Sequence, residues 1–466
     1  MGRKKKKEIL ENVKIEKIAA KGKALARVDG IVVFVTGAVP GDVVDILVTK
    51  KRKSYKEGII LKFHEYSKDR TEPKCKHFGV CGGCKWQFLP YNKQLEYKRN
   101  EVVEAFEHIA GVTPETVEDI VPSQKIFHYR NKLEYTFSNR RWFEQKLEEG
   151  EQPGDRDALG FHVPRLFDRV VDIEECWLQP EPSNAIRNFV RRVAKENNYS
   201  FYDIREHKGY LRNLVVRNNR DGDFMVILIV AEEREDTAFI LDDISVNFPQ
   251  VKSLYYIVNT KKNDSYADLE PVLYKGEPYL NEKIGNLKFR IHPKSFFQTN
   301  ADQGERLYEI AKEFAQLTGD EIVYDLYTGT GTIALFVADK AKKVVGIEYI
   351  PEAIEDAKEN AAMNGIENAE FFAGDIKDLL NEEFFGAHGK PDVVILDPPR
   401  AGMHQNVVDA IKYAAPQRIV YVSCNPSTQA RDVGLLSDMY HLVKTRPVDM
   451  FPHTHHIENV ALLVRK

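Results

Sequence analysis

Residues 322–332 read Ile-Val-Tyr-Asp-Leu-Tyr-Thr-Gly-Thr-Gly-Thr, a short apolar run followed by a polar turn with two closely spaced glycines. Such a run predicts a buried strand, and glycines at its end let the backbone pass close under a ligand. Gly329 and Thr332 are therefore candidate ligand-binding positions. A dinucleotide fingerprint needs a third glycine, but Ile333 and Ala334 follow Thr332, so a pyrophosphate site is not predicted.

Alternating strands and helices continue from this segment to the C-terminus. Apolar runs predict further strands at residues 343–347, 369–372, 393–396 and 418–422. Helices are predicted at 302–316 and at 351–364, the latter with proline in its first turn. This alternation predicts a mostly parallel sheet with helices on both faces, and hence a Rossmann-like α/β domain over residues 291–466.

Acidic residues stand at the ends of successive predicted strands. Glu348 lies 23 residues beyond Asp325, where an acid can accept both ribose hydroxyls. Asp375 and Asp397 end the third and fourth strands. Three acids suit a ligand with a ribose, an adenine amino group and a cationic amino acid. That description fits S-adenosylmethionine better than NAD, the alternative being a nucleotide fold that binds another ligand.

The first 290 residues are mostly β in pattern. Residues 1–66 contain four or five short strands separated by glycine turns, which predicts a small β-barrel of the kind that binds RNA. Residues 67–290 predict a central, mostly β domain. A helix at 91–110 interrupts it and is expected to pack on the catalytic domain. Its apolar side chains predict a buried face made of Leu95, Val102, Val103, Phe106 and Ile109.

Charge and composition bound the class of protein. The net charge is −4, yet residues 1–70 hold 18 Lys and Arg against nine Asp and Glu. A basic module on an acidic body favours a polyanion partner, namely RNA, although Lys4–Lys7 alone suit a solubilising tail. The acidic segment 145–157 predicts an exposed loop. The absence of a long apolar run predicts no membrane partner and a cytoplasmic location.

Five cysteines occur, and the odd number argues against a disulfide framework. Four of them, Cys75, Cys81, Cys84 and Cys176, form a metal-binding pattern. The pattern leaves zinc and an iron–sulfur cluster open, and three clustered cysteines plus one remote cysteine favour a [4Fe–4S] cluster. Trp86 and Trp177 each stand close to a predicted ligand and are expected to shield it, with ordinary core packing as the alternative.

The fifth cysteine, Cys424, follows the apolar run 418–422 and precedes a polar turn. A thiol at a strand end is a candidate nucleophile, although free cysteine is also among the most buried residue types. Glu458, 34 residues later, offers a carboxylate as a proton acceptor. His453, His455 and His456 precede it and also suggest zinc. However, adjacent histidines point apart on an extended chain, which favours a role in orienting Glu458.

These segments together resemble the RNA uracil-5-methyltransferases. The matching stretches are residues 292–300, 325–331, 397–400, 423–426 and 450–458, and the N-terminal barrel resembles a TRAM domain. The resemblance implies a class I S-adenosylmethionine methyltransferase fold and a [4Fe–4S] cluster. Thr328 departs from the family pattern, in which many relatives have cysteine.

The resemblance also implies roles for individual residues. Cys424 would attack C6 of uracil and Glu458 would remove the C5 proton, while Asp397 would hold the uracil edge or activate the addition. Gln298 would contact the methionine portion of S-adenosylmethionine, and Tyr327 would pack near its adenosine. The basic barrel and the cysteine cluster resemble those of the family members that act on 23S ribosomal RNA. We expect this protein to be a monomer.

Three alternatives remain open at this level. They are a transfer-RNA uracil-5-methyltransferase, an amino-group methyltransferase that uses Asp397-Pro398-Pro399, and a non-catalytic RNA-binding protein. The aromatic and basic runs at residues 129–132 and 210–213 predict contacts to unpaired bases and phosphates.

Overall fold

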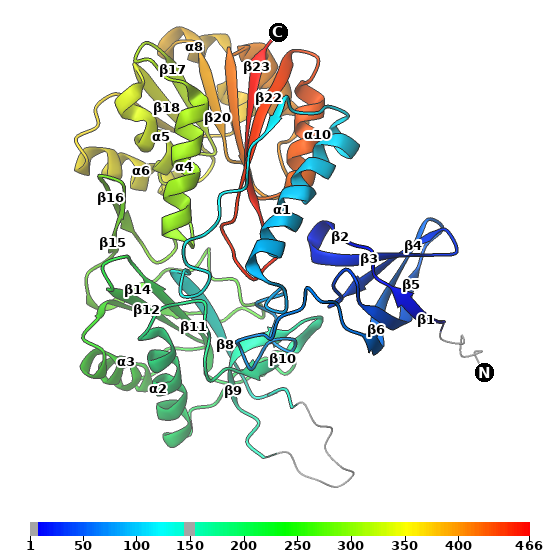
Figure 1. The fold of residues 1–466 in the computed structure, drawn as a ribbon. Helices are drawn as coiled ribbons and strands as arrows, with labels where there is room; N and C mark the ends of the chain where they lie inside the picture. Colours follow the sequence, from blue (N-terminus) through cyan, green and yellow to red (C-terminus); the bar gives the residue numbers. More distant parts are fainter. Residues whose placement is uncertain (1–7, 144–153) are drawn as a thin grey trace.

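The computed structural model describes residues 8–143 and 154–466, and it contains three units (Figure 1). The predicted tail Lys4–Lys7 and most of the acidic segment 145–157 lie outside the described residues. Within the described part of the chain, none of the helices is long and apolar enough to cross a bilayer.

The C-terminal unit is built on an eight-stranded sheet. Its order is β19-β18-β17-β20-β21-β23-β22-β7, and among these strands only β23 runs against the others. The strands are β7 (Thr116–Val117), β17 (Ile322–Leu326), β18 (Lys343–Glu348), β19 (Ala369–Ala373), β20 (Val393–Leu396), β21 (Arg418–Ser423), β22 (Tyr440–Val448) and β23 (Glu458–Arg465). The predicted opening strand, β17, lies in the middle of the parallel part.

Helices cover both faces of this sheet because its strands are apolar on both sides. Val323 belongs to the core under α4, α5 and α6, whereas the adjacent Tyr324 belongs to the core under the other helices. The helices are α4 (Ala301–Ala315), α5 (Thr332–Val337), α6 (Pro351–Met363), α7 (Ile376–Leu379), α8 (Glu382–His388), α9 (Gln405–Ala414) and α10 (Pro426–Leu436). The predicted Rossmann-like class is confirmed.

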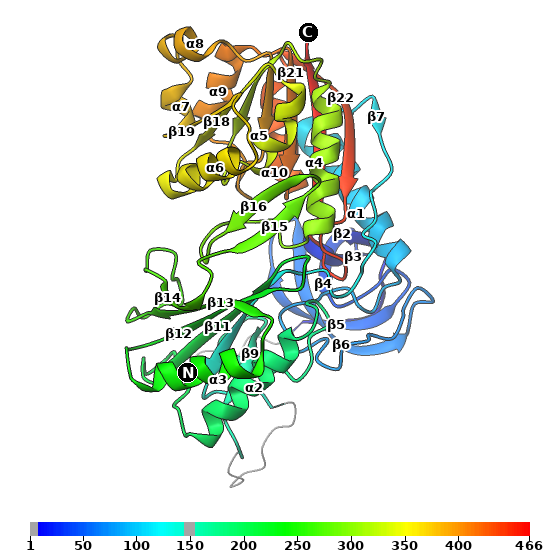
Figure 2. The ribbon, with the colours of Figure 1, turned by 90° about the vertical axis from the view of Figure 1, so that its left-hand side faces the viewer.

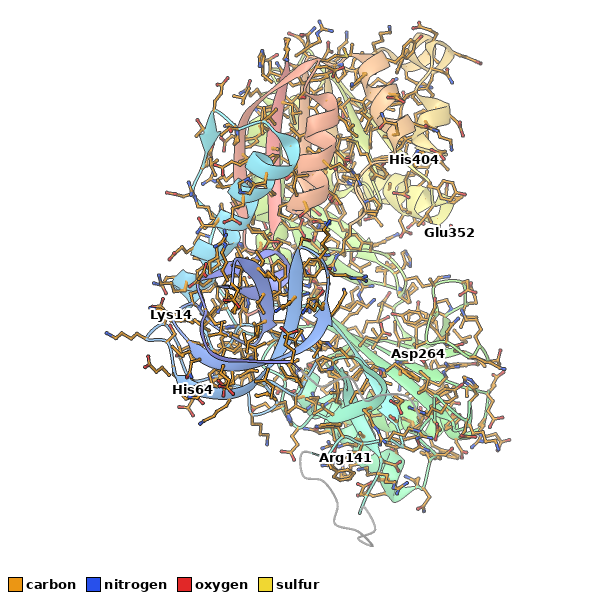
Figure 3. The ribbon with its side chains drawn as sticks, turned by 90° about the vertical axis from the view of Figure 1, so that its right-hand side faces the viewer. Lys14, His64, Arg141, Asp264, Glu352 and His404 are labelled. Atoms are coloured by element: carbon orange, nitrogen blue, oxygen red, sulfur yellow. The ribbon has the colours of Figure 1, made fainter. Side chains whose placement is uncertain are left out.

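The N-terminal unit is one curved, barrel-like sheet of six strands, in the order β1-β5-β6-β4-β3-β2. The strands are β1 (Ile9–Lys14), β2 (Lys17–Ala19), β3 (Lys23–Val28), β4 (Ile31–Thr36), β5 (Val43–Lys51) and β6 (Tyr55–Glu65). Every second residue, such as Val33, Val35, Val44 and Ile46, lies in its core. Figure 3 shows this unit in front of the junction between the two larger units.

The central unit has a seven-stranded sheet in the order β10-β9-β8-β11-β12-β13-β14. Its elements are β8 (Lys132–Ser138), β9 (Ala158–Val163), β10 (Leu166–Asp172), β11 (Leu211–Asn218), β12 (Phe224–Val230), β13 (Val251–Val258), β14 (Val272–Gly276), α2 (Ser183–Glu196) and α3 (Asp236–Asn247). β12 is buried on both faces. Val226 packs in the core that includes α2 and α3, and Ile227 packs in the core shared with the hairpin β15 (Leu280–Ile284) and β16 (Leu287–Ile291) (Figure 2).

Helix α1 (Tyr91–Ala105) packs with the C-terminal unit, and its buried face agrees only in part with the predicted one. Its buried residues include Gln94, Lys98 and Val102, whereas Ile109 is 50% exposed. The predicted apolar face is therefore wrong in part, because two polar side chains are buried against partners that lie far away in the sequence. Since β7 also joins the C-terminal sheet, we propose that residues 91–117 be grouped with that unit.

The predicted RNA contacts at residues 210–213 are wrong. Tyr210 and Arg212 are 0% and 1% exposed. Arg212 donates hydrogen bonds to the backbone carbonyls of Asn259, Lys261 and Asn263. This arginine therefore closes a loop inside the central unit, since a buried guanidinium needs acceptors for its donors.

Substitution of two glycines in the C-terminal unit should change stability in opposite directions. A Cβ atom at Gly346 would lie 2.5 Å from Cδ1 of Phe371, so Gly346→Ala should lower the unfolding free energy by about 1–3 kcal/mol through overpacking. Gly386 lies in α8, and a Cβ atom added there would have no other atom within 4 Å. Gly386→Ala should therefore raise the unfolding free energy by up to about 1 kcal/mol. Urea unfolding followed by circular dichroism measures the unfolding free energy of both variants. Equal changes in the two variants would contradict the prediction.

Candidate active site and cysteine site

The turn after β17 has the backbone that its sequence predicts. Tyr327, Gly329 and Gly331 have φ values of 66°, 56° and 79°. Asp325 holds the turn because one of its carboxylate oxygens accepts hydrogen bonds from Thr328 Oγ1 at 2.6 Å and Ala334 N at 3.0 Å. Its other oxygen, Oδ1, is buried without a partner, and burial raises the pKa of Asp325 to about 7.

The next two acids shape the rim of this turn. Glu348 accepts hydrogen bonds from the backbone N–H groups of Gly329, Tyr349 and Ile350, so it fastens the glycine turn to the end of β18. Asp375 caps α7 and pairs with Lys377, whose hydrogen bond is the main cause of its lowered pKa.

Tyr327 lies near enough to both acids for their charges to affect its pKa. The pKa of Tyr327 is raised to about 12, chiefly by burial and further by the nearby carboxylates of Asp432, Asp375 and Glu348. Three of the predicted cofactor residues, Tyr327, Glu348 and Asp375, are therefore neighbours at one edge of the sheet.

A second group of predicted cofactor residues surrounds the hydroxyl of Tyr308. Thr332 Oγ1 lies 3.3 Å from that hydroxyl, and the side chain of Gln298 is near enough to lower the pKa of Tyr308. Burial is the main cause of the raised pKa of Tyr308, and the carboxylates of Asp397 and Asp325 raise it further. The central unit positions Gln298, since Asn131 Nδ2 donates to its carbonyl at 3.0 Å.

The three predicted catalytic residues come together at the same edge. Cys424 follows β21, Asp397 follows β20 and Glu458 begins β23. Burial raises the pKa of Cys424 to about 11, and the carboxyl groups of Glu458 and Asp397 add to that effect. Burial raises the pKa of Asp397 to about 7 and that of Glu458 well above its usual value. The cluster thus combines a protonated thiol with carboxyl groups that hold protons unusually strongly.

Sequence reasoning assigned no role to Arg400, although it ends the quoted run Asp397–Arg400. Arg400 lowers the pKa values of both Cys424 and Glu458, since its positive charge favours the ionised forms of the thiol and the carboxyl group. Its carbonyl accepts hydrogen bonds from Asn425 Nδ2 at 3.0 Å and Thr428 Oγ1 at 3.3 Å. Arg400 could have been identified from its place in this run, because a guanidinium is always charged and can lower the pKa of a nearby candidate thiolate.

The three histidines lie in the segment that leads to Glu458. Burial lowers the pKa of His453 and His455 to about 4 and that of His456 to about 3, so all three are neutral near pH 7. The rings of His455 and His456 lie 4.2 Å apart. The expectation that they point apart is wrong, because the chain is bent here and not extended. His456 Nδ1 instead lies 3.4 Å from the guanidinium of Arg400.

The four cysteines of the predicted metal site surround one cavity. Cys75, Cys81, Cys84 and Cys176 all line a space of about 360 Å³, and all are free thiols. Burial raises the pKa of Cys84 to about 11 and that of Cys81 to about 12. Within the described residues, no group of three or more Cys, His, Asp or Glu side chains is arranged to hold a single metal ion.

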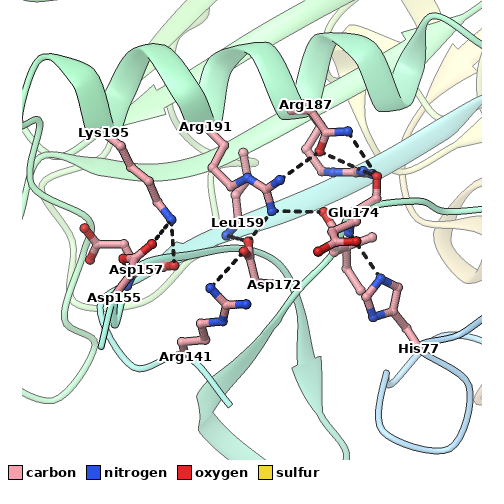
Figure 4. A network of polar contacts seen from close by, with 12 residues as sticks. His77, Arg141, Asp155, Asp157, Leu159, Asp172, Glu174, Arg187, Arg191 and Lys195 are labelled. Carbon is pink, nitrogen blue, oxygen red and sulfur yellow. Dashed lines mark hydrogen bonds and ion pairs between the residues drawn. The ribbon is translucent and has the colours of Figure 1, made fainter. Parts of the chain in front are cut away.

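Hydrogen bonds join the cysteine loop to the segment that carries the remote cysteine. His77 Nε2 accepts a hydrogen bond from Glu174 N, and Arg187 donates to the carbonyl of Glu174 (Figure 4). Asn184 accepts from Cys176 N at 2.8 Å and donates to Cys176 O at 3.2 Å. Residues 75–84 and Cys176 are thus held together by the central unit.

The two tryptophans that were expected to shield the cysteines lie in different places. Trp177 lines the cysteine cavity, with Lys74 Nζ 3.6 Å from its ring centroid. Trp86 does not line that cavity and packs in a separate core with Val39 and Leu89. Trp86 was expected near the cysteines because it follows the cysteine loop directly, but the backbone turns its side chain toward Val39 of the N-terminal unit.

The sheet order, the glycine turn and the acids at the strand ends define a Rossmann-like transferase unit. Comparisons with known proteins specify it further. The family described as tRNA (Uracil-5-)-methyltransferase matches residues 277–466, and the TRAM domain family matches residues 10–61.

Two relatives named as uncharacterized RNA methyltransferases match almost the whole chain. One from Bacteroides thetaiotaomicron is 52% identical over 451 residues, covering 96% of this chain and 99% of its own. One from Porphyromonas gingivalis is 51% identical over 464 residues, covering 97% and 99%. The crystal structure of Pyrococcus abyssi tRNA (uracil-54, C5)-methyltransferase in complex with S-adenosyl-L-homocysteine matches with a TM-score of 0.75 and 30% identity. It covers 98% of this chain and 100% of that one. The chain therefore belongs to the family of RNA uracil-5-methyltransferases.

The raised pKa of Cys424 predicts slow alkylation at neutral pH. Iodoacetamide should modify Cys424 about tenfold faster for each pH unit, with no plateau below about pH 10, because only the thiolate reacts. Arg400→Met should shift the profile to higher pH, since the guanidinium lowers this pKa, and Arg400→Lys should shift it less. Mass spectrometry of the Cys424 peptide measures the rate, and a plateau near pH 8 would contradict the prediction.

Proposed function

We propose that this enzyme methylates C5 of a uridine in RNA through a covalent bond between Cys424 and C6 of the base. Family membership supports S-adenosylmethionine as methyl donor and RNA as substrate. The single observation that carries the covalent mechanism is the convergence of Cys424, Glu458, Asp397 and Arg400 at the carboxyl edge of the sheet.

The residues suit the binding of S-adenosylmethionine, which supplies an electrophilic methyl group when bound. The unpaired, buried Oδ1 of Asp325 and the open space around Gly329 leave room and an acceptor beside the turn. Glu348 and Asp375 would accept from the ribose and the adenine, with Tyr327 beside them, whereas Gln298, Thr332 and Asp397 would hold the methionine portion.

The chain's own groups would then carry the chemistry on the base. The Cys424 thiolate adds to C6, and electron density moves to C5, which becomes nucleophilic and is methylated. Glu458 takes the C5 proton, the C–H electron pair forms the C5–C6 double bond, and the C6–S bond breaks to release the thiolate. Arg400 stabilises the thiolate before attack and after release. Target C6 is inaccessible inside a stacked helix, so the uridine must be flipped out or unpaired.

RNA that contains 5-fluorouridine tests this mechanism, because fluorine at C5 cannot be removed as a proton is. With S-adenosylmethionine, the wild type and Glu458→Gln should form a denaturation-resistant protein–RNA adduct, whereas Cys424→Ala should form none. On natural RNA, Cys424→Ala should lower kcat/KM by about four orders of magnitude or more. Full activity of Cys424→Ala would instead favour an amino-group methyltransferase that uses Asp397-Pro398-Pro399.

We further propose 23S ribosomal RNA as the substrate. The support is the basic β-barrel combined with the four-cysteine site, which resembles the members that act on ribosomal RNA. The exposed end of the β5–β6 hairpin carries Arg52 and Lys53, which suit contacts to phosphates. Transfer RNA is the second candidate, because the solved relative from Pyrococcus abyssi is named for uracil 54 of transfer RNA.

The two substrates can be separated directly. Purified 23S ribosomal RNA and total transfer RNA from a strain without the gene are incubated with the enzyme and S-adenosylmethionine that carries a labelled methyl group. Label in 23S ribosomal RNA alone is expected, and label in transfer RNA alone would overturn the ribosomal assignment but not the chemistry.

We also propose that Cys75, Cys81, Cys84 and Cys176 bind a [4Fe–4S] cluster. The four thiols line one cavity, and three clustered cysteines with one remote cysteine favour a cluster over a single zinc ion. The cluster would hold the cysteine loop against the central unit.

Anaerobic purification tests the cluster with a matched pair of variants. The wild type and Cys424→Ser should show the broad visible absorption of an iron–sulfur cluster, with iron and sulfide in equal amounts. Cys176→Ser should lose both, since it removes one of four ligands. Bound zinc without sulfide in the wild type would contradict the assignment.

A further inference from the structure

We propose that Lys98 of α1 is a positioning residue for Glu458, acting through the segment 449–457, and that it serves the removal of the C5 proton. This inference rests on the proposed function. Lys98 Nζ lies 2.6 Å from Asp449 Oδ1 and 3.0 Å from the carbonyl of Phe451. Lys98 therefore holds two points of the segment that ends at the predicted base.

The ion pair is completely buried, because the side chains of Lys98 and Asp449 are both 0% exposed. Burial lowers the pKa of Lys98 and the charge of Asp449 opposes that effect. Removing two charges from water is costly, and apolar side chains of similar size would fill the same space at no such cost. The pair is thus hard to explain by stability alone, whereas it restricts the segment to one position.

Weaker bonds hold the rest of the segment from several sides. The carbonyl of His453 accepts from Lys85 N at 2.8 Å and from Trp86 N at 2.9 Å, directly after the cysteine loop. Gln94, one turn before Lys98 on α1, accepts from His453 N at 2.7 Å. From α4, Gln303 Nε2 donates to the carbonyl of Asp449 at 3.0 Å. These bonds are neutral, so the charge of Lys98 supplies the strongest single constraint.

The segment has a direct mechanical connection to Glu458. It joins the end of β22 to the start of β23, where Val448 pairs with Glu458. The side chain of Glu458 has no hydrogen-bond partner that would fix it independently among the described residues, so its position follows its backbone. Proton removal needs the carboxylate within hydrogen-bonding reach of C5, and a displacement of about 1 Å can cost about 100-fold in rate.

Proton removal follows adduct formation and methyl transfer, so the proposal predicts which step changes. In Lys98→Met, kcat on uridine RNA should fall about 10-fold or more while KM for RNA stays similar. The adduct with natural uridine should accumulate on denaturing gels. The rate of adduct formation with 5-fluorouridine RNA should stay near the wild-type rate, because that adduct forms without the C5 proton step.

Val102→Ala is the matched control. Val102 lies one turn further along α1, is 0% exposed and packs in the core with α10, and its apolar side chain places no charge on the segment. It should lower Tm without accumulating the adduct. If Lys98 has only a structural role, Lys98→Met should behave like Val102→Ala, or should slow adduct formation with 5-fluorouridine as much as turnover. Either result would overturn the proposal.

A double-mutant cycle provides an independent readout. In the Glu458→Gln background, adding Lys98→Met should produce little further slowing of adduct breakdown, because both changes affect the same step through the same group. Additive slowing would mean that Lys98 acts without Glu458. Absence of any adduct in the wild type would instead refute the covalent mechanism itself, so the two failures are distinguishable.

Discussion

The antiparallel pairing of β21 with β23 is the interaction on which the active site depends. It sets Ser423 opposite Asn459, so Cys424 and Glu458 lie next to each other although 34 residues separate them in sequence. Because β20 lies on the other side of β21, Asp397 and Arg400 reach the same edge. The thiol and its predicted base therefore meet at the ends of two paired strands, and the guanidinium reaches them from the loop after β20.

The same closeness creates an electrostatic conflict. Glu458 and Asp397 each raise the pKa of Cys424, and Asp397 raises that of Glu458. Arg400 is the opposing charge from a neighbouring loop, and it cannot lose its proton in a protein. The Cys424 thiol of the ligand-free site is thus protonated near neutral pH. A methyl donor with a sulfonium charge would add a second positive charge, which favours thiolate formation only when the substrates are bound.

Much of the fold and the site could be predicted from the sequence because their signals are local. Strand ends, glycine turns and the acids after them are short patterns, and the structure brings Cys424, Glu458 and Asp397 together as the family resemblance implies. Contacts between distant segments carry no local signal. Gln94 and Lys98 are polar and do not belong to the predicted apolar face of α1, and Tyr210 and Arg212 look like an RNA-binding pair, yet all four are buried. Each of them has a partner far away in the sequence, namely the amide of His453 for Gln94, Asp449 for Lys98, the Thr237 hydroxyl for Tyr210 and backbone carbonyls of residues 259–263 for Arg212, which no window of residues reveals.

The segment 449–457 explains why three units are joined at one place. α1 contacts it through Lys98 and Gln94, the cysteine loop through the amides of Lys85 and Trp86, and the central unit through Tyr129, whose hydroxyl donates to the carbonyl of Pro452. The N-terminal unit approaches it as well, since a Cβ atom at Gly22 would lie 2.7 Å from Cβ of His455. If one of these units binds RNA, its contacts with segment 449–457 join that unit to the part of the chain that leads to Glu458. The segment that leads to Glu458 is therefore held by contacts from the whole chain, in addition to the pairing of β23 in the catalytic sheet.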